Sequence, residues 1–171
     1  MHLSQFFSAT VALSGLLTAA ASPLAVRNPD ASVDLSGFVW GGVAPINRTA
    51  SAAEERGVLG KRDTCYRQDP FSAADMRALK ARLQGSRQNE MVELKHGFVT
   101  WWDQGSVKLC VYNNYIFENT HLKWWEAGWA VGYIDSACCS SNSQCGGGTC
   151  TCHGDSGLSL EAKLRTSVYG C

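Results

Sequence analysis

All eight cysteines of the chain follow a single dibasic pair, Lys61-Arg62. Eight cysteines allow four disulfides, each worth about 2–4 kcal/mol to a small domain, chiefly because a bridge restricts the unfolded chain. Such bridges form and persist in oxidising compartments. We therefore expect a mature, disulfide-stapled domain over residues 63–171. The pairing stays open, but every cysteine is expected to join a bridge: Cys65, Cys110, Cys138, Cys139, Cys145, Cys150, Cys152 and Cys171.

The N-terminus has the pattern of a secretory signal peptide. Residues 6–17 form an apolar run too short to cross a bilayer, and Ala19-Ala20-Ala21 provides small residues for cleavage after Ala21. A buried helix of a cytosolic protein is the alternative, which the cysteine content disfavours. We expect a signal peptide at 1–21 and a secreted, extracellular protein.

Residues 22–62 are predicted to be a pro-segment. The stretch is rich in Ala, Ser, Gly and Val without helical or strand periodicity, so we expect it to be weakly structured. Asn47-Arg48-Thr49 is a glycosylation sequon, which makes Asn47 a candidate acceptor. Lys61-Arg62 marks the change from cysteine-free to cysteine-rich sequence, where a kexin-type protease of the secretory pathway would cut.

Charge and cysteine spacing argue against several classes of partner. Fifteen basic and fifteen acidic residues give a formal net charge of +0, so no basic field attracts nucleic acid, and we expect no nucleic-acid partner. The alternative use of cysteine is a metal site. The spacing Cys145-x4-Cys150-x-Cys152 is not a zinc-knuckle pattern, so we expect no metal and no cofactor.

Periodicity predicts two helices. Ser72 with Asp75 resembles a capping box that starts a helix over 73–84, with Met76 near its start and Gly85 at its end. Thr120 is a candidate cap for a second helix through Ser136. Leu122, Trp125, Trp129 and Tyr133 share one side of that helix, and glycines 128 and 132 lie on a neighbouring face, which suggests close packing on a sheet.

Alternation predicts the strands. Residues 91–112 alternate around a turn at 103–105, and residues 158–168 alternate without a break, whereas 140–155 is expected to be a Gly/Ser/Cys loop. The order of elements predicts an α+β fold, a small disulfide-stapled α/β sandwich with an antiparallel sheet and two helices on one face.

Three short motifs resemble functional segments of known families. Cys152-His153-Gly154-Asp155-Ser156-Gly157 resembles the nucleophile segment of trypsin-like proteases, but the chain lacks that family's other motifs and the length for its two barrels. Cys138-Cys139-x5-Cys145 resembles the centre of hevein-type chitin-binding modules, without their stacking aromatics. We expect neither activity.

The third motif, Tyr112-Asn113-Asn114-Tyr115, matches the base-binding loop of small secreted guanyl ribonucleases. The residue types for general acid–base chemistry and phosphate binding are present, although not in that family's order. A polar turn after a strand is the simpler interpretation. The candidate residues are Glu93, His96, Glu118, His121 and Arg165.

Tryptophan is the other candidate for function. In the pairs Trp101-Trp102 and Trp124-Trp125 the two rings of each pair point to different sides. We expect Trp125 and Trp129 to pack in the core and at least one of Trp101 and Trp102, together with Trp124, to lie at the surface. Trp101, Trp102 and Trp124 are thus a candidate binding surface for sugars, a membrane interface or a protein.

The chain also resembles fungal killer-toxin-like effectors, which are small secreted cysteine-rich proteins. The similar features are Gly105-x-Val107-x-x-Cys110-x-Tyr112, Ile134-x3-Cys138 and a closing strand into Cys171, whereas Cys139, Cys145, Cys150 and Cys152 depart from the simplest pattern. The resemblance implies an antiparallel sheet with helices on one face. It also implies a non-enzymatic toxin or host-directed effector, with a membrane, channel or cell-wall target.

Three hypotheses follow from these observations. The first is a secreted toxin or effector that acts on a target-cell surface component, either protein or glycan. The second is a cell-wall or glycan-binding protein. The third is a small extracellular ribonuclease. The first two need no catalytic residue, and on balance we expect a protein that is not an enzyme.

Overall fold

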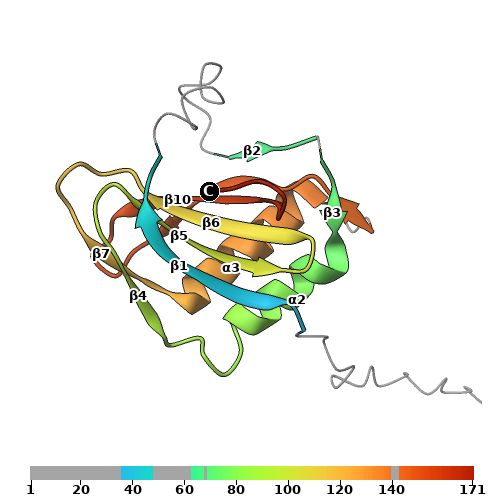
Figure 1. The fold of residues 1–171 in the computed structure, drawn as a ribbon, viewed down its shortest axis with the longest axis horizontal. Helices are drawn as coiled ribbons and strands as arrows, with labels where there is room; N and C mark the ends of the chain where they lie inside the picture. Colours follow the sequence, from blue (N-terminus) through green and yellow to red (C-terminus); the bar gives the residue numbers. More distant parts are fainter. Residues whose placement is uncertain (1–35, 48–62, 68, 140–142) are drawn as a thin grey trace, which may run out of the picture. The chain divides into compact units, whose positions relative to one another are not determined.

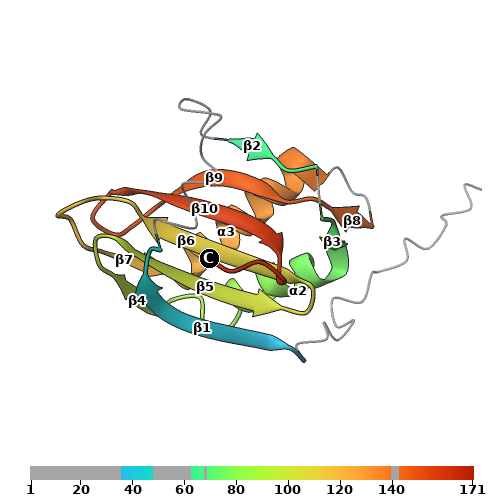
Figure 2. The ribbon, with the colours of Figure 1, turned by 45° about the horizontal axis from the view of Figure 1, so that its top comes forward.

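A computed structural model describes residues 36–47, 63–67, 69–139 and 143–171. Their main element is a six-stranded sheet in the order β1-β5-β6-β10-β9-β2, in which all neighbours are antiparallel. Figures 1 and 2 show helices α2 and α3 on one face of this sheet. The predicted α+β fold, a disulfide-stapled antiparallel sheet with two helices on one face, is therefore confirmed.

The sheet strands, in spatial order, have the following bounds: β1 Phe38–Pro45, β5 Phe98–Gln104, β6 Val107–Asn113, β10 Ser159–Thr166, β9 Gly148–His153 and β2 Thr64–Cys65. Two small antiparallel pairs flank the sheet, namely β3 Phe71–Ser72 with β8 Gln144–Cys145, and β4 Met91–Leu94 with β7 Thr120–Lys123. The helices are α2 Ala73–Leu83 and α3 Trp124–Ile134, and α3 runs into a π-helical turn, η1 Asp135–Cys139.

The alternation of apolar residues in β10 decides which face of the sheet meets the helices. Leu160, Ala162 and Leu164 are buried, whereas the residues between them are partly exposed. This is the pattern of a strand with one covered face, and it confirms the predicted strand over most of 158–168. Met76, Leu79 and Leu83 of α2 and Ala127, Ala130 and Val131 of α3 belong to the same core cluster.

Helix α2 begins as predicted, although its cap is more elaborate than a capping box. Asp75 N–H donates to Ser72 Oγ at 3.4 Å. The Asp75 carboxylate does not bond the Ser72 backbone. It accepts from Ser106 N–H (2.8 Å) and Ser106 Oγ (2.6 Å), and Ser106 Oγ in turn accepts from Ser72 N–H at 2.9 Å. The start of α2 is thereby joined to the β5–β6 turn.

The second helix starts later than predicted, because residues 120–123 form strand β7. The Thr120 hydroxyl bonds Asp155 and Ser156 and caps no helix. Helix α3 has no side-chain cap at Lys123. Its first N–H groups donate to loop carbonyls, from Trp124 to Glu90 at 3.0 Å and from Trp125 to Gln88 at 3.0 Å. Tertiary contacts replace the local cap that sequence patterns rely on.

The glycines of α3 face helix α2, so the prediction that they pack on a sheet is wrong. A Cβ at Gly128 would lie 2.6 Å from Gln84 Cγ and 3.0 Å from Leu83 Cβ, and one at Gly132 would lie 2.8 Å from Lys80 Nζ. The missing side chains let the two helices approach closely.

The prediction of weak structure for residues 22–62 is wrong for 38–45, which form the edge strand β1. Seven residue pairs join β1 to β5, from Phe38 opposite Gln104 to Pro45 opposite Phe98, with a bulge at Gly41. The sequence hides this strand because two glycines interrupt it and because its apolar residues do not alternate. The expected loop over 140–155 is likewise wrong, since it contains β8 and β9.

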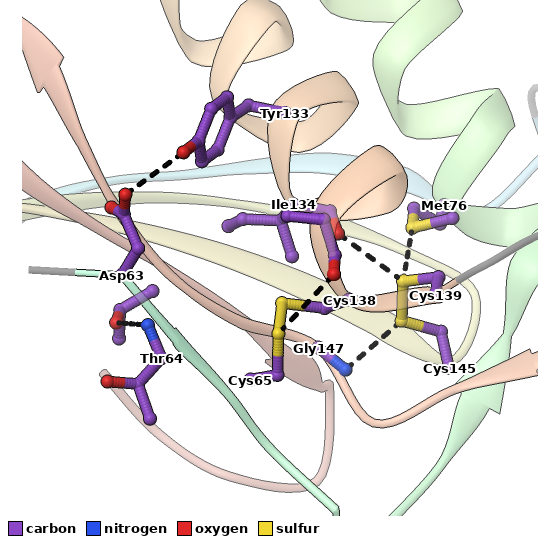
Figure 3. The surroundings of a disulfide bond; sticks show 12 residues. Asp63, Thr64, Cys65, Met76, Tyr133, Ile134, Cys138, Cys139, Cys145 and Gly147 are labelled. Carbon is purple, nitrogen blue, oxygen red and sulfur yellow. Dashed lines mark hydrogen bonds between the residues drawn. A yellow bond between two sulfur atoms is a disulfide. The ribbon is translucent and has the colours of Figure 1, made fainter.

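All eight cysteines lie in the described part of the chain, and three disulfides join six of them. Cys65–Cys138 ties β2 to η1, Cys139–Cys145 ties η1 to β8, and Cys110–Cys171 ties β6 to the chain end (Figure 3 shows the first two). Cys171 closes a second, small apolar cluster on the sheet face opposite the helices, with Val99, Cys110, Tyr112, Ile46 and Trp101.

Cys150 and Cys152 are buried free thiols, which corrects the expectation that every cysteine is bridged. The two residues are two apart on β9, so both side chains point to the helix-covered face, about 6.6 Å apart along the strand. A disulfide needs its Cβ atoms within about 4.5 Å, and an extended strand does not offer that approach.

Candidate binding surface

The outer face of α3 carries three large aromatic side chains, Trp125, Trp129 and Tyr133, which we call the α3 aromatic stripe. Their exposed fractions are 44%, 36% and 38%. The rings of Trp129 and Tyr133 are stacked, with centroids 5.4 Å apart and an interplanar angle of 27°. Spacing of four residues brings successive rings onto one side of a helix, so the three side chains lie along one exposed side of α3.

A shallow cavity of about 270 Å³ lies beside the stripe, between α2 and α3. Trp129 and Tyr133 form its apolar wall, and Gly132 lies between them in the sequence. Its polar lining comes from Lys80 and Gln84 of α2 and from Ser136. A ligand on this surface would therefore meet aromatic faces next to hydrogen-bonding groups, the combination that fixes the orientation of a bound molecule.

Tyr133 is held in place at the end of the stripe. Its hydroxyl donates to Asp63 Oδ2 at 3.0 Å, as Figure 3 shows. This hydrogen bond to a carboxylate raises the pKa of the tyrosine hydroxyl above its ordinary value. Because Asp63 comes directly after Lys61-Arg62, the first residue of the expected mature domain contacts the α3 aromatic stripe.

The structure reverses the expected roles of the tryptophans. Trp102 and Trp124 are buried, with exposed fractions of 0% and 1%, and their rings meet edge to face at 5.9 Å. Of the predicted surface only Trp101 is partly exposed, and it belongs to the small cluster on the opposite face of the sheet. Trp125 and Trp129, expected in the core, are at the surface.

The reversal has a simple cause. The prediction placed Leu122 on the helix with Trp125, Trp129 and Tyr133, but Leu122 belongs to β7 and is buried there, so it does not mark the inner side of α3. The buried face of α3 consists of Trp124 followed by small and aliphatic residues at 127, 128, 130, 131 and 134. This second periodic set is visible in the sequence and indicates which side of α3 is buried.

A polar cluster joins β7 to the β9–β10 loop. Asp155 accepts from His121 N–H at 2.9 Å and lies 3.2 Å from His121 Nδ1, and the Thr120 hydroxyl donates to Asp155 at 3.1 Å. The His121 N–H, together with that hydroxyl and the imidazole, lowers the pKa of the Asp155 carboxyl. Ser156 Oγ donates to Thr120 Oγ1 at 2.7 Å, so the protease-like segment pairs its serine with a hydroxyl.

The residues of the ribonuclease hypothesis are only partly brought together. Glu93 lies opposite His121 in the β4–β7 pair. Arg165 lies near the far end of β10, six residues from the first residue of the strand, Ser159, which is about 20 Å at ~3.3 Å per residue. Its guanidinium donates a hydrogen bond to Tyr112 Oη at 3.1 Å. His96 bonds Asn119, and the exposed Glu118 gives its carbonyl to Asn113.

Asn113, at the centre of the ribonuclease-like motif, is fully buried. Its amide donates to the carbonyls of Leu94 (3.1 Å) and Glu118 (2.8 Å), and its Oδ1 accepts from Tyr115 N–H. The side chain therefore organises the loop after β6. This geometry matches the simpler interpretation, a polar turn after a strand.

A larger groove of about 480 Å³ is lined by residues of β2 and the segment after it and by residues at and after the end of β10. Arg67 and Arg165 contribute positive charge to its lining, and Tyr169 donates a hydrogen bond to Asp69 Oδ2 at 2.6 Å across part of it. Asp69 has a positive φ of 53°. The Asp69–Tyr169 bond joins the segment before β3 to the chain after β10, so we assign the pair a structural role.

Several predicted positions bear on processing. Ala21, Lys61 and Arg62 lie outside the described residues, whereas Asn47 is described and exposed. Within the described ranges no group of three His, Cys, Asp or Glu side chains could hold a metal ion. Among the helices described, none has the length and apolar content needed to cross a membrane.

Comparison with known proteins returned no match to any protein family, any curated protein or any solved structure. The three disulfides are compatible with an extracellular protein.

Proposed function

We propose that the protein is a secreted, non-enzymatic toxin or host-directed effector that binds a target-cell surface component through the α3 aromatic stripe. The observation that carries this proposal is the exposure of Trp125, Trp129 and Tyr133 on one helix face. Partly exposed Trp and Tyr side chains are the residue types that most often dominate binding energy at protein interfaces. The resemblance to killer-toxin-like effectors supports the same class of activity.

The packing of α3 strengthens the argument for a binding role. Its inner face is filled by Trp124 and by Ala127, Ala130, Val131 and Ile134, all nearly or fully buried. The stripe on the outer side is thus not needed to complete the core. The exposed parts of these three side chains offer apolar area that a partner can cover at about 25 cal/mol per Å².

The proposal is tested by adding the oxidised protein to yeast, plant and insect cells and recording both cell binding and dye uptake. The test variant is Trp125→Ser with Trp129→Ser. The matched control is Phe117→Ser, which removes a more exposed aromatic ring, 88% exposed, from the β6–β7 loop.

We expect wild type and Phe117→Ser to bind at least one cell type and the double variant to bind at least tenfold less. Loss of two hot-spot rings at about 2 kcal/mol each would exceed this threshold. Equal binding of all three proteins would rule out the α3 aromatic stripe. Absence of binding and of dye uptake in every cell type would contradict the effector role.

A cell-wall or glycan ligand is the second candidate, favoured by the cavity beside the stripe. Lys80, Gln84 and Ser136 place hydrogen-bonding groups next to the Trp129 ring, as sugar sites require. Sedimentation with insoluble cell-wall polysaccharides distinguishes the two candidates. Retention of wild type that Gln84→Ala and Trp129→Ser each weaken would indicate a glycan, whereas cell binding that survives enzymatic removal of surface glycans would indicate a protein.

A further inference from the structure

Strand β1 lies on the N-terminal side of the expected cut at Lys61-Arg62. The first cysteine of the chain is Cys65, so no disulfide can hold β1 once the chain is cut. In the structure the strand nevertheless completes the sheet at the β5 edge, as Figure 2 shows. Cutting would turn an intramolecular strand into a separate peptide.

The β5 edge contacts the backbone of its occupant with buried polar side chains. Thr100 Oγ1 donates to the Gly42 carbonyl at 2.8 Å, and Gln104 Nε2 donates to the Ser36 carbonyl at 2.9 Å. Thr100 and Gln104 are 0% and 2% exposed. At the other end, Ile46 N–H donates to the Gly97 carbonyl at 2.8 Å. Recognition of an extended backbone is typical of sheets that accept a strand from a partner.

The side chains of β1 define what the edge accepts. The Phe38 ring lies 5.9 Å from the Trp124 ring and under the Arg82 guanidinium, and the Trp40 ring lies 6.5 Å from Trp124. Gly41 rests on the Trp101 indole, where any side chain would overlap the ring. Gly42 has a φ of +97°, which favours glycine at this position too. The preferred occupant is therefore an extended segment of the pattern aromatic-x-aromatic-Gly-Gly.

Much of β1 stays in water. Val39, Trp40 and Val43 are 55%, 45% and 39% exposed, so a large part of the strand's apolar surface stays uncovered. In the uncut chain, covalent connection to the domain gives the strand an effective concentration on the order of millimolar, which a cut abolishes. A vacant β5 would present unpaired N–H and C=O groups, which favours refilling by another strand.

We propose that the β5 edge is a strand-binding site and that β1 is its exchangeable occupant once the chain is cut after Arg62. The ligand class is an extended peptide with two aromatic residues spaced by one and followed by two glycines. The inference depends on the expected cut but not on the proposed effector role, since it concerns a different surface from the α3 aromatic stripe.

The experiment uses the full oxidised chain, before and after cleavage with a kexin-type protease, and a fluorescent peptide of residues 36–47. We expect the cut chain to bind the labelled peptide and release its own N-terminal fragment, as fluorescence anisotropy and native mass spectrometry would report. The uncut chain should bind at least 100-fold more weakly, because the tethered strand competes. The same peptide carrying Gly41→Val should not bind.

Four outcomes would overturn the proposal. The first is a fragment that stays bound without exchanging. The second is a folded cut chain that ignores the peptide. The third is equal binding of the Gly41→Val peptide. The fourth is loss of near-ultraviolet circular dichroism on cutting, which would make β1 an integral strand. If the second outcome occurs and the cut chain dimerises in light scattering, the edge belongs to a second copy of the chain instead.

Discussion

At the residue scale, Asp75 connects two parts of the fold that lie far apart in the sequence. Its carboxylate accepts two hydrogen bonds from Ser106, and a Cβ at Gly105, which has φ +54°, would lie 2.6 Å from Asp75 Oδ2. Helix α2 and the β5–β6 turn are therefore fixed to each other by one side chain. The turn needs glycine at 105 both for its backbone conformation and for this approach.

We predict that Asp75→Asn lowers the free energy of unfolding by about 1–3 kcal/mol, because the Ser106 donors lose a charged acceptor. Urea denaturation of the oxidised protein measures the loss. The control is a double-mutant cycle with Ser106→Ala, in which a coupling energy of at least about 0.5 kcal/mol is expected. Additive effects would mean that the Asp75–Ser106 contact does not stabilise the protein.

Two glycines on α3 should respond differently to the same substitution. Gly128→Ala places a methyl group against Leu83 Cβ, which cannot move without the helix, and should destabilise by about 1–3 kcal/mol. Gly132→Ala meets only the flexible end of Lys80, so the gain in helix propensity of about 1 kcal/mol should leave stability unchanged or raised. Thermal unfolding of the two variants compares them. Equal destabilisation would mean that Gly132, like Gly128, faces a part of α2 that cannot move aside.

The Asp155 cluster predicts a pH dependence of stability in acid. Hydrogen bonds in the folded state lower the Asp155 pKa, so the unfolded chain binds the proton more readily. The contribution is fully present above the unfolded value of about 3.9 and is lost as the pH falls through the folded value. Below about pH 4, the thermal unfolding midpoint of the wild type should therefore fall more steeply with decreasing pH than that of Asp155→Asn. Parallel curves for the two proteins would mean that the Asp155 carboxylate does not contribute to stability.

At the scale of the elements, the sequence predicts a helix or strand best when the residues that determine it lie within that element. Helix α2 has a local cap and β10 has unbroken alternation, and both lie close to their predicted bounds. Strand β7 and the start of α3 depend on distant partners, namely β4 and the carbonyls of Gln88 and Glu90. Strand β9 hides in a Gly/Ser/Cys stretch because its partner β10 supplies the stability that its own propensity lacks.

Strand β9 also carries a chemical prediction. Burial, and to a lesser extent the nearby Asp63 and Glu126 carboxylates, raises the pKa of the Cys150 thiol to about 12. Burial also raises the pKa of the Cys152 thiol. Neither thiol should react with Ellman's reagent at pH 8 in the native protein, whereas two thiols per chain should react in guanidinium. If no thiol reacts in the denatured protein, Cys150 and Cys152 form a fourth disulfide. If the thiols react quickly in the native protein, β9 is not buried.

At the scale of the whole molecule, the sequence separates the chain at Lys61-Arg62, whereas the sheet extends across that boundary. Cysteine distribution predicts the stapled domain because disulfides follow from composition. It cannot predict β1, whose partner β5 lies about sixty residues away in the sequence and whose glycines suit a turn as well as a bulge. The exposed face of α3 cannot be predicted for a similar reason, since two periodic faces of the helix compete and only packing against the sheet decides between them.

Hydrogen–deuterium exchange of the full oxidised chain tests the central claim, a sheet that begins at Phe38, most directly. The structure predicts that within 38–45 the amides directed toward β5, roughly half of them in an edge strand, exchange slowly. Ile46 N–H, bonded to the Gly97 carbonyl, should be protected as well. Complete exchange of 38–46 within seconds, while β6 and β10 remain protected, would contradict the account, because β1 would then not belong to the folded sheet.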